Sequence, residues 1–455
     1  MKYLTSALLT ACLTAFSLTP ALAQSEPTPA QVKTTQKIKV YPLPGGLDQS
    51  PMLNSNSPEI VEEAGILVST LPGKGPAYLD YGFKGRFGIF SHHIARDKAP
   101  GERLLYLGTL VSNPHSTPVK LQLESGASYL SQPDALFKKW PGLMNNPDGT
   151  VYAGPGDRVT TELLTDTDPV SPRTIVIPPR STQLISSLSV PTDVAILPPI
   201  NGRSTLLYFN SPASVYVSHV AYFANKVNGQ FVSPTLEDYR ALLNSGKMAG
   251  KRESAPTNYM RDPKPKGAFR YGRVAGVSQG LTWKAKLFEG DMLVRRPEAG
   301  ETIGYPFSAV YLKRMGTSQN QSGELLRRYP DTAYQNHANY GVRYDIDIPL
   351  HNRTGNYQTY SVGLAHPTSQ DAQESTFVFP PNKPVMFRGS SKLSWVDEYA
   401  QPHTIVKHHV LQHGQEPQQM ALITVPPGID YDLKLSMYYP ADCTPPQLLT
   451  LSRIE

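Results

Sequence analysis

The sequence predicts a mainly β protein with two β-sandwich, immunoglobulin-like modules joined by a short helical, proline-rich connector. Apolar and polar residues alternate with a period of two in several short runs, such as Val119–Leu123 and Tyr344–Leu350, as in strands with one buried face. Proline occupies 43 of 455 positions, which disfavours long helices because proline lacks the amide donor. A hydrophobic content of 39% is enough for a core, and this length predicts more than one domain.

The first 23 residues have the layout of an export signal. A positively charged start precedes an apolar stretch, which ends in the small-residue pattern Ala21-Leu22-Ala23. We expect cleavage after Ala23, so that the mature chain begins at Gln24 and works in the periplasm or outside the cell. An alternative stays open, since the residues before Cys12 resemble a lipoprotein box and could make Cys12 a lipid-modified N-terminus. No later run reaches 18 apolar residues, so no transmembrane segment is expected after signal cleavage.

The remaining chain divides by composition and pattern. Residues 24–60 are polar and rich in Pro, Ser and Thr, and we expect a flexible lead-in there. The N-terminal β-sandwich is expected over residues 61–232. Its strands are predicted at 104–111, 119–123, 174–178, 183–190, 204–209 and 214–223.

Three predicted strands end in a Pro-Pro pair and are followed by another strand. The pairs lie at 178–179, 380–381 and 426–427. Because proline cannot donate a hydrogen bond to a β-ladder, each pair ends its strand. We interpret each pair as the turn of a hairpin. One pair lies in the N-terminal half and two in the C-terminal half, without a fixed period, which favours two modules over a repeat array.

One helix is well indicated, within an expected connector at residues 233–268. Thr235 is a suitable N-cap with Asp238 three residues later, and Gly246 is a suitable end. The rest of the connector is basic and contains prolines. The C-terminal β-sandwich is expected over residues 269–455. Its clearest strands are predicted at 341–350, 357–364, 419–425 and 431–438.

Composition excludes several classes of protein. After cleavage the chain keeps one cysteine, Cys443, which rules out an internal disulfide and a cysteine-based metal site. The net charge of +6 is spread thinly over the chain, and the dense basic stretches are short, so nucleic acid is not an expected partner.

Ser278 lies in a motif, Gly276-Val-Ser278-Gln-Gly280, that matches the nucleophile elbow of α/β-hydrolases. That motif acts only between a strand and a helix. The residues that follow, 281–287, alternate with period two and therefore predict a strand. We expect Ser278 to lie in a turn between strands and not to be catalytic.

Histidines gather in one segment, and two aspartates lie close together in another. In a strand, His409 and His413 share a face but stand about 13 Å apart at ~3.3 Å per residue, too far to bind one ion. Asp345 and Asp347 fit the wet face of a strand. We therefore assign no catalytic, cofactor-binding or metal-binding residue and expect no cofactor. The histidines concerned are His403, His408, His409 and His413, with His92 and His93 as a second pair.

Several longer stretches resemble a known family. They are Gly85–Arg96, Leu105–Gly108, Gly126–Asp134, Val151–Gly156, Asn201–Thr205, Arg328–Gln335 and Asn339–Val342. The resemblance covers nearly the whole mature chain and is to a family of exported cyanobacterial proteins, domain of unknown function 3370. It implies a Gram-negative-type cell envelope, and it supplies no activity and no catalytic residues.

Function follows only in outline from these features. Tyrosine is abundant, 25 residues against 14 Phe, and suits carbohydrate stacking and protein interfaces as well as strand faces. With export and a modest positive charge, this predicts a non-enzymatic envelope or extracellular-matrix protein that binds acidic surface polysaccharide or an envelope protein. The alternative is a hydrolase of envelope glycans. A carboxylate pair in one cleft would favour the hydrolase, whereas a flat Tyr-rich face would favour binding.

Overall fold

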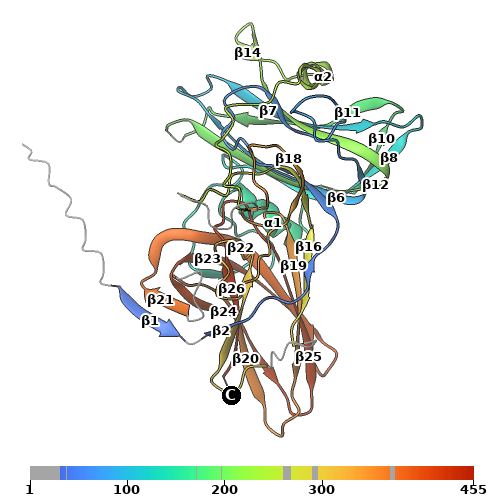
Figure 1. Cartoon of the computed structure of the whole chain (residues 1–455). Helices are drawn as coiled ribbons and strands as arrows, with labels where there is room; N and C mark the ends of the chain where they lie inside the picture. The colour runs from blue at the N-terminus through green and yellow to red at the C-terminus, as the bar shows by residue number, and fades with distance from the viewer. Residues whose placement is uncertain are drawn as a thin grey trace, which may run out of the picture.

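The computed structural model describes residues 31–36, 38–170, 172–195, 197–259, 268–288, 296–368 and 375–454. The predicted export signal, Cys12 included, lies outside the described residues. Strands make up 52% of the chain and helices 5%, which confirms the mainly β prediction. Figure 1 shows two β-rich bodies, one above the other, with helix α1 (Pro155–Thr165) between them.

The upper body is a ten-stranded sheet that folds over onto itself. Its main path runs β10-β8-β12-β6-β4-β15-β18, and β5, β7 and β11 lie off this path. Strand β12 belongs to both layers, because it pairs with β6 and β8 up to Ser211, with β6 once more at Val215, and with β7 and β5 from Tyr216 onward. The predicted strands at 204–209 and 214–223 are therefore the two parts of one strand. The strands are β4 Pro51–Ser55, β5 Gly65–Ser69, β6 Phe83–Arg96, β7 Leu104–Asn113, β8 Val119–Leu130, β10 Arg173–Ile177, β11 Ser181–Pro191, β12 Ile200–Phe223, β15 Ala275–Gln279 and β18 Leu325–Arg328.

The lower body has a seven-stranded sheet, β3-β16-β19-β25-β22-β23-β9, and a five-stranded sheet, β2-β17-β26-β20-β24. Both contribute to one buried core, with Tyr344 and Leu435 from the first and Val362 and Leu451 from the second. The strands are β2 Ile38–Val40, β3 Gly46–Leu47, β9 Leu143–Asn145, β16 Thr282–Lys286, β17 Thr302–Phe307, β19 Arg343–His351, β20 Gln358–His366, β22 Asn382–Val396, β23 Pro402–His413, β24 Gln415–Val425, β25 Asp430–Tyr438 and β26 Gln447–Arg453. Two small ribbons are formed by β1 Val32–Gln36 with β21 Ser375–Phe379, and by β13 Lys226–Val227 with β14 Gln230–Phe231.

Strands from each half of the sequence complete the sheets of the other half. β15 and β18 extend the upper sheet, whereas β2, β3 and β9 belong to the lower sheets. Two separate immunoglobulin-like modules are thus not confirmed, and the boundaries at 61–232, 233–268 and 269–455 stay predictions. Residues 51–55, which the sequence places in a flexible lead-in, form β4, where Met52 and Leu53 are fully buried. β4 has only five residues, too few to show a period-two pattern, and polar residues flank it, so the sequence does not reveal this strand.

The Pro-Pro pairs end strands as predicted, but they do not form hairpins. β10 pairs with β8, while the strand after it, β11, pairs with β7 in the other layer. β24 pairs with β20 and the following β25 pairs with β19, again in different sheets. β21 pairs with β1, and β22 with β23 and β25. Proline interrupts the ladder, and here the interruption lets the chain cross to another sheet.

Two helices lie within the described residues. α2 (Leu236–Ser245) confirms the predicted helix, with Thr235 and Asp238 forming a capping box and Gly246 at its C-cap. α1 was not predicted. Residues on nearly every side of α1 are buried, the polar Asp157, Thr160 and Thr161 among them, and the helix begins after Gly154 without a side-chain cap, so the sequence carries no N-cap signal for it. Its apolar residues, including Val159 and Leu163, pack with residues of both bodies.

Candidate functional site

Ser278 lies in β15 and is fully buried, and β16 follows it after a short turn. This confirms the predicted strand after the motif, although Ser278 itself is in a strand and not in the turn. Asp345 and Asp347 lie half-buried on β19, where they alternate with buried Tyr344 and Ile346 as predicted. Asp345 accepts hydrogen bonds from Arg343 and from Ser436, so it is part of the sheet's polar face.

The four clustered histidines all lie on β23, and each contacts a different polar partner. The contacts are His403 with Asp397 at 2.8 Å, His408 with Asp157 at 2.7 Å, His409 with Ser391 at 2.7 Å and His413 with Asn382 at 2.8 Å. His92 and His93 on β6 contact Ser204 and Ser55. Within the described ranges, no group of three or more His, Cys, Asp or Glu is arranged to hold a metal ion.

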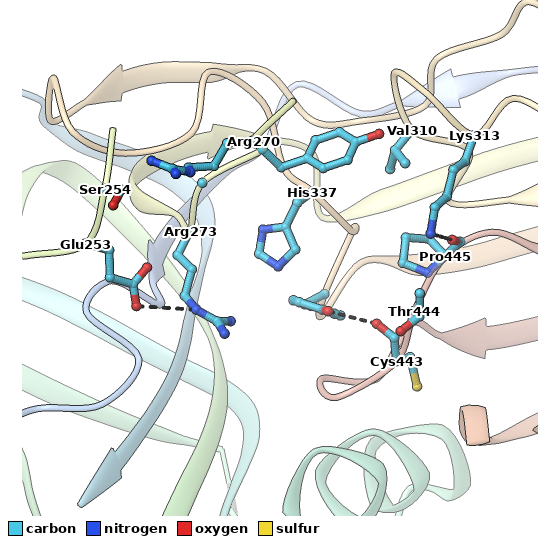
Figure 2. A pocket seen from close by; sticks show the side chains of 13 residues that line it. Glu253, Ser254, Arg270, Arg273, Val310, Lys313, His337, Cys443, Thr444 and Pro445 are labelled. Atoms are coloured by element: carbon cyan, nitrogen blue, oxygen red, sulfur yellow. Dashed lines mark hydrogen bonds and ion pairs between the residues drawn. The ribbon is translucent and has the colours of Figure 1, made fainter. Parts of the chain in front are cut away.

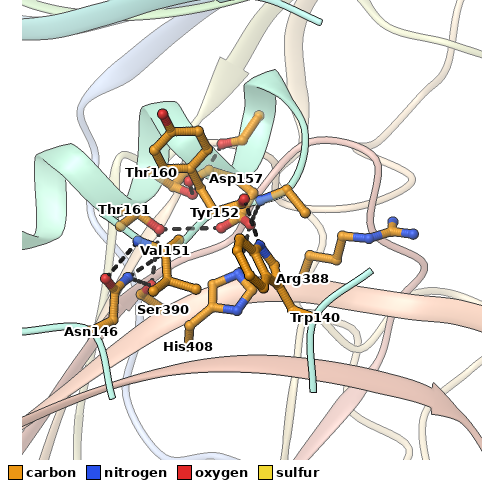
Figure 3. Close-up of polar contacts among 12 residues, drawn as sticks. Trp140, Asn146, Val151, Tyr152, Asp157, Thr160, Thr161, Arg388, Ser390 and His408 are labelled. Carbon is orange, nitrogen blue, oxygen red and sulfur yellow. Dashed lines mark hydrogen bonds and ion pairs between the residues drawn. The ribbon is translucent and has the colours of Figure 1, made fainter. Parts of the chain in front are cut away.

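The contact between His408 and Asp157 fixes helix α1 to the lower body. His408 Nε2 donates to Asp157 Oδ2, which also accepts the Ala153 amide at 2.7 Å. The other oxygen accepts a hydrogen bond from Thr161, whose hydroxyl meets that of Ser390 on β22. Figure 3 shows this network between the helix and the strands below it. Since His408 and Asp157 are both buried, the network is a structural anchor between the two bodies.

Many of the tyrosines serve the core, ten of them being buried. Those with less than 2% exposure are Tyr208, Tyr239, Tyr305, Tyr329, Tyr344, Tyr360 and Tyr439. A ring buried to this degree offers no stacking surface to a sugar. The tyrosine count is therefore mainly a structural signal, as its strand-face interpretation predicts.

A cavity of about 780 Å³ lies at the end of the lower body where segment 138–142 faces β22, β23 and β24. We call it the basic groove. Its charged lining is entirely cationic among the described residues, and none of these four cations forms an ion pair with a described residue. Two aromatic rings and three amides complete the polar and stacking groups. These groups are Lys138, Lys139, Lys383 and Arg388, then Trp140 and Phe379, and then Gln412, Gln415 and Gln418.

The rings and amides of the basic groove are held in place by neighbours. Trp140 Nε1 donates to the carbonyl of Tyr152 at 2.8 Å, which orients the indole, and the Lys138 ammonium lies 5.5 Å from its ring centre. Phe379 is 67% exposed at the rim. Gln418 Nε2 donates to a backbone carbonyl at 3.3 Å, and its side chain also interacts with the imidazole of His409.

Strand β1 supports one wall of the basic groove. It pairs with β21, whose last residue is Phe379. Just before β1, Gln31 Nε2 donates to the carbonyl of Pro380 at 2.9 Å and to Asn382 at 3.0 Å. Thr34 donates to Glu416 on β24 at 2.7 Å. The N-terminal strand thus fixes the corner that carries the exposed ring.

Carboxylates gather elsewhere, between the two bodies. Glu59 Oε1 and Asp442 Oδ1 lie 3.9 Å and 3.3 Å from the same nitrogen, His92 Nε2. Arg273 contacts Glu59 at 2.5 Å. Burial raises the pKa of Glu59 even though Arg273 and His92 act to lower it. Asp442 also lines an apolar cavity of about 410 Å³. A hydrolase would need a pair of carboxylates in one cleft, and Glu59 and Asp442 meet part of that condition, because only Asp442 lines this cavity.

The sequence could have indicated the basic groove in one place only. Phe137-Lys-Lys-Trp140 has two aromatic residues beside two lysines, in a segment without strand periodicity. Aromatic rings outside predicted strands are exposed more often than rings within them. The other wall, from 379 to 388, reads as an ordinary turn and strand. No local pattern brings the two walls together.

A family model described as "Protein of unknown function (DUF3370)" matches residues 37–453. A search of curated protein sequences finds no match. Among solved structures, a tandem CBM22 domain of Xyn10C from Paenibacillus barcinonensis shares 12% identity, with 87% of this chain and 99% of that chain covered and a TM-score of 0.16. A single-site variant of oxalate decarboxylase from Bacillus subtilis shares 7%, with 88% and 80% covered and a TM-score of 0.13. These scores are too low to support an argument. No helix among the described residues is long and apolar enough to cross a membrane.

Proposed function

This chain belongs to the DUF3370 family, and from that premise we propose that it is an exported, non-enzymatic protein that binds acidic polysaccharide in the basic groove. One observation carries the proposal: four cationic side chains and two aromatic rings line a single cavity that contains no carboxylate among its described residues. Its volume of about 780 Å³ is in the range of ligand pockets.

The chemistry of the basic groove matches a chain of sugar acids. Cations without nearby carboxylates attract anions, and the field is stronger in a cavity than on a flat surface. The apolar faces of sugar rings stack on aromatic side chains, here Trp140 and Phe379. The amides of Gln412, Gln415 and Gln418 can exchange hydrogen bonds with hydroxyl groups. A neutral polysaccharide would not use the cations, and a simple anion would not use the rings.

Export is the second part of the proposal. It is supported by the leader pattern that ends at Ala23, and it places the basic groove in the periplasm or outside the cell, where surface polysaccharides are found. A second envelope protein remains the other candidate partner. Binding of such a protein to the mature chain, with no affinity for any polysaccharide, would favour that partner.

The test compares two triple variants of the mature protein. Lys138→Ala, Lys139→Ala and Lys383→Ala remove three cations from the basic groove. The matched control removes three exposed lysines elsewhere, Lys74, Lys84 and Lys434. We expect the groove variant to bind alginate, a polyuronate, about 10- to 100-fold more weakly, from roughly 0.5–1 kcal/mol for each exposed ion pair. The control variant should bind like the wild type.

Three further measurements separate charge attraction from ring stacking. Binding to alginate should weaken with salt, since charges are screened over about 8 Å at physiological ionic strength. Trp140→Ala should weaken binding at high salt as well as at low salt, because stacking is not screened. Dextran, which is neutral, should not bind. An equal loss of alginate affinity in the two triple variants would refute the basic groove as the binding site. Tighter binding of single-stranded DNA than of alginate would refute polysaccharide as the ligand.

Hydrolysis of envelope glycans is the second candidate function, and the shared contact of Glu59 and Asp442 with His92 favours it. A carboxyl group with a raised pKa can act as a general acid. Release of reducing sugar from envelope polysaccharide, abolished by Glu59→Gln, would establish this function. Binding without release would leave the protein as a binding protein.

A further inference from the structure

A second polar cavity, of about 430 Å³, lies near the carboxylate cluster and is separate from the basic groove. We call it the junction pocket. Residues from three parts of the chain form its walls: residues 253–254 and 270–273 after α2, residues 310, 313, 337 and 340 before β19, and residues 443–445 before β26. Figure 2 shows side chains from these stretches converging on the cavity.

The charged side chains of the junction pocket are three cations and one carboxylate. Arg273 is held by its ion pairs, with Glu59 at 2.5 Å and with Glu253 at 3.3 Å. Lys313 Nζ donates to the carbonyl of Pro445 at 3.5 Å. Arg270 is exposed. Because Arg273 is paired with two carboxylates, the positive charge available to a ligand comes from Arg270 and Lys313.

His337 provides a polar group that the protein does not use. Its Nδ1 atom is buried and has no hydrogen-bond partner among the described residues. Burial, with a smaller contribution from Arg273, lowers the pKa of His337 to about 4. At neutral pH the imidazole is thus neutral, with one nitrogen donating and one accepting. A buried ring nitrogen without a partner is uncommon and indicates a missing water or ligand.

An aromatic wall stands beside this histidine. Tyr340 meets His337 edge to face, with ring centres 5.2 Å apart. The Tyr340 hydroxyl donates to the carbonyl of Cys443 at 2.8 Å, which fixes the ring. The junction pocket thus combines an anion-attracting end, a neutral hydrogen-bonding group and a fixed ring.

We propose that the junction pocket binds one sugar acid, a monosaccharide that carries a carboxylate. The carboxylate faces Arg270 and Lys313, a ring hydroxyl bonds to the imidazole of His337, and the sugar ring lies against Tyr340. This site does not rest on the basic groove, because the two cavities share no lining residue. A polysaccharide in the basic groove and a single sugar acid in the junction pocket are bound independently.

The test measures binding of free glucuronate and galacturonate to the mature full-length protein by calorimetry, with glucose and inorganic phosphate as comparisons. We expect one saturable site for the sugar acids and none for glucose. Arg270→Ala together with Lys313→Ala should weaken binding at least about tenfold, as loss of charged hydrogen bonds predicts. The triple lysine variant of the basic groove should bind sugar acids like the wild type while losing alginate.

His337→Phe is the sharpest variant, because it keeps a ring of similar size and removes only the nitrogens. The ring of His337 makes no hydrogen bond to a described residue, so we expect normal folding, checked by the melting temperature, and about tenfold weaker binding of the sugar acids. No saturable binding by the wild type would overturn the proposal. Binding of phosphate as tight as that of glucuronate, or unchanged binding by His337→Phe, would also overturn it.

Discussion

Buried neutral histidines should make this protein unstable in mild acid. Burial lowers the pKa of these side chains far below the usual value of about 6.5. In the unfolded chain they take up protons below about pH 6.5, whereas in the folded chain they do not until the pH is near 4 or 3. Stability is therefore full above pH 6.5 and is lost as the pH falls below it. The pKa is about 3 for His219, His366 and His409 and about 4 for His337, and it lies well below 6.5 for His93.

The expected loss is large. A histidine with a pKa of 6.5 unfolded and about 3 folded loses roughly 2 kcal/mol of stability between pH 8 and pH 5. Four such groups together lose on the order of 8 kcal/mol, which is comparable to the typical total of about 5–15 kcal/mol. The carboxylates with lowered pKa, such as Asp238 and Asp397, contribute only at still lower pH. Histidine burial alone therefore predicts a large loss of stability by pH 5.

Urea unfolding of the mature protein at pH 7.5 and at pH 5 measures this effect. His409→Gln keeps a polar group near Nε2, which contacts Ser391 at 2.7 Å, and removes the titration. Whatever the stability of this variant at pH 7.5, its free energy of unfolding should fall by about 2 kcal/mol less than that of the wild type between pH 7.5 and pH 5. Equal stability of the wild type at pH 7.5 and pH 5, or an unchanged loss in the variant, would refute the reasoning.

Three further outcomes are expected. Asp157→Ala should destabilise the protein by about 3–5 kcal/mol in urea unfolding, because it leaves the buried His408 imidazole and the Ala153 amide unpaired. Glu237→Ala, on the exposed side of α2, is the control and should change stability by less than about 0.5 kcal/mol. A loss below about 1 kcal/mol for Asp157→Ala would contradict the structural anchor. N-terminal sequencing of native protein should begin at Gln24, and a lipid-modified Cys12 would contradict this. Cys443 is buried and its pKa is raised by burial, so a thiol reagent should label it only on unfolding; fast labelling of native protein would count against the fold around it.

The sequence predicts strands well and their partners poorly. Period-two alternation places β19 and β25 within a few residues, because each has one buried and one wet face. Capping residues locate α2 for the same local reason. Pairing is not local, so the Pro-Pro segments are correctly predicted as strand ends and wrongly as hairpins. α1 escapes prediction because it has no side-chain N-cap and because several of its buried residues are polar.

The candidate sites are predicted even less well, for a related reason. Lys383 lies in an unremarkable segment, and only the fold brings it into one cavity with Lys139. His337 is an isolated histidine in the sequence, and its missing partner is visible only in the structure. The histidine cluster on β23 attracts attention in the sequence, yet the fold gives its members separate partners.

The exchange of strands between the two halves of the sequence means that the upper sheet cannot be completed until the later half of the chain is available. β4 lies between β6 and β15 in the upper sheet, and β15 begins only at Ala275. A chain that emerges N-terminus first, from the ribosome or, under the proposed export, from a membrane, presents the edge of β4 to solvent until that later segment has followed. Unpaired strand edges recruit other chains, so protection by a holding chaperone fits this topology. For the same reason, fragments that stop before Ala275 should aggregate when produced alone.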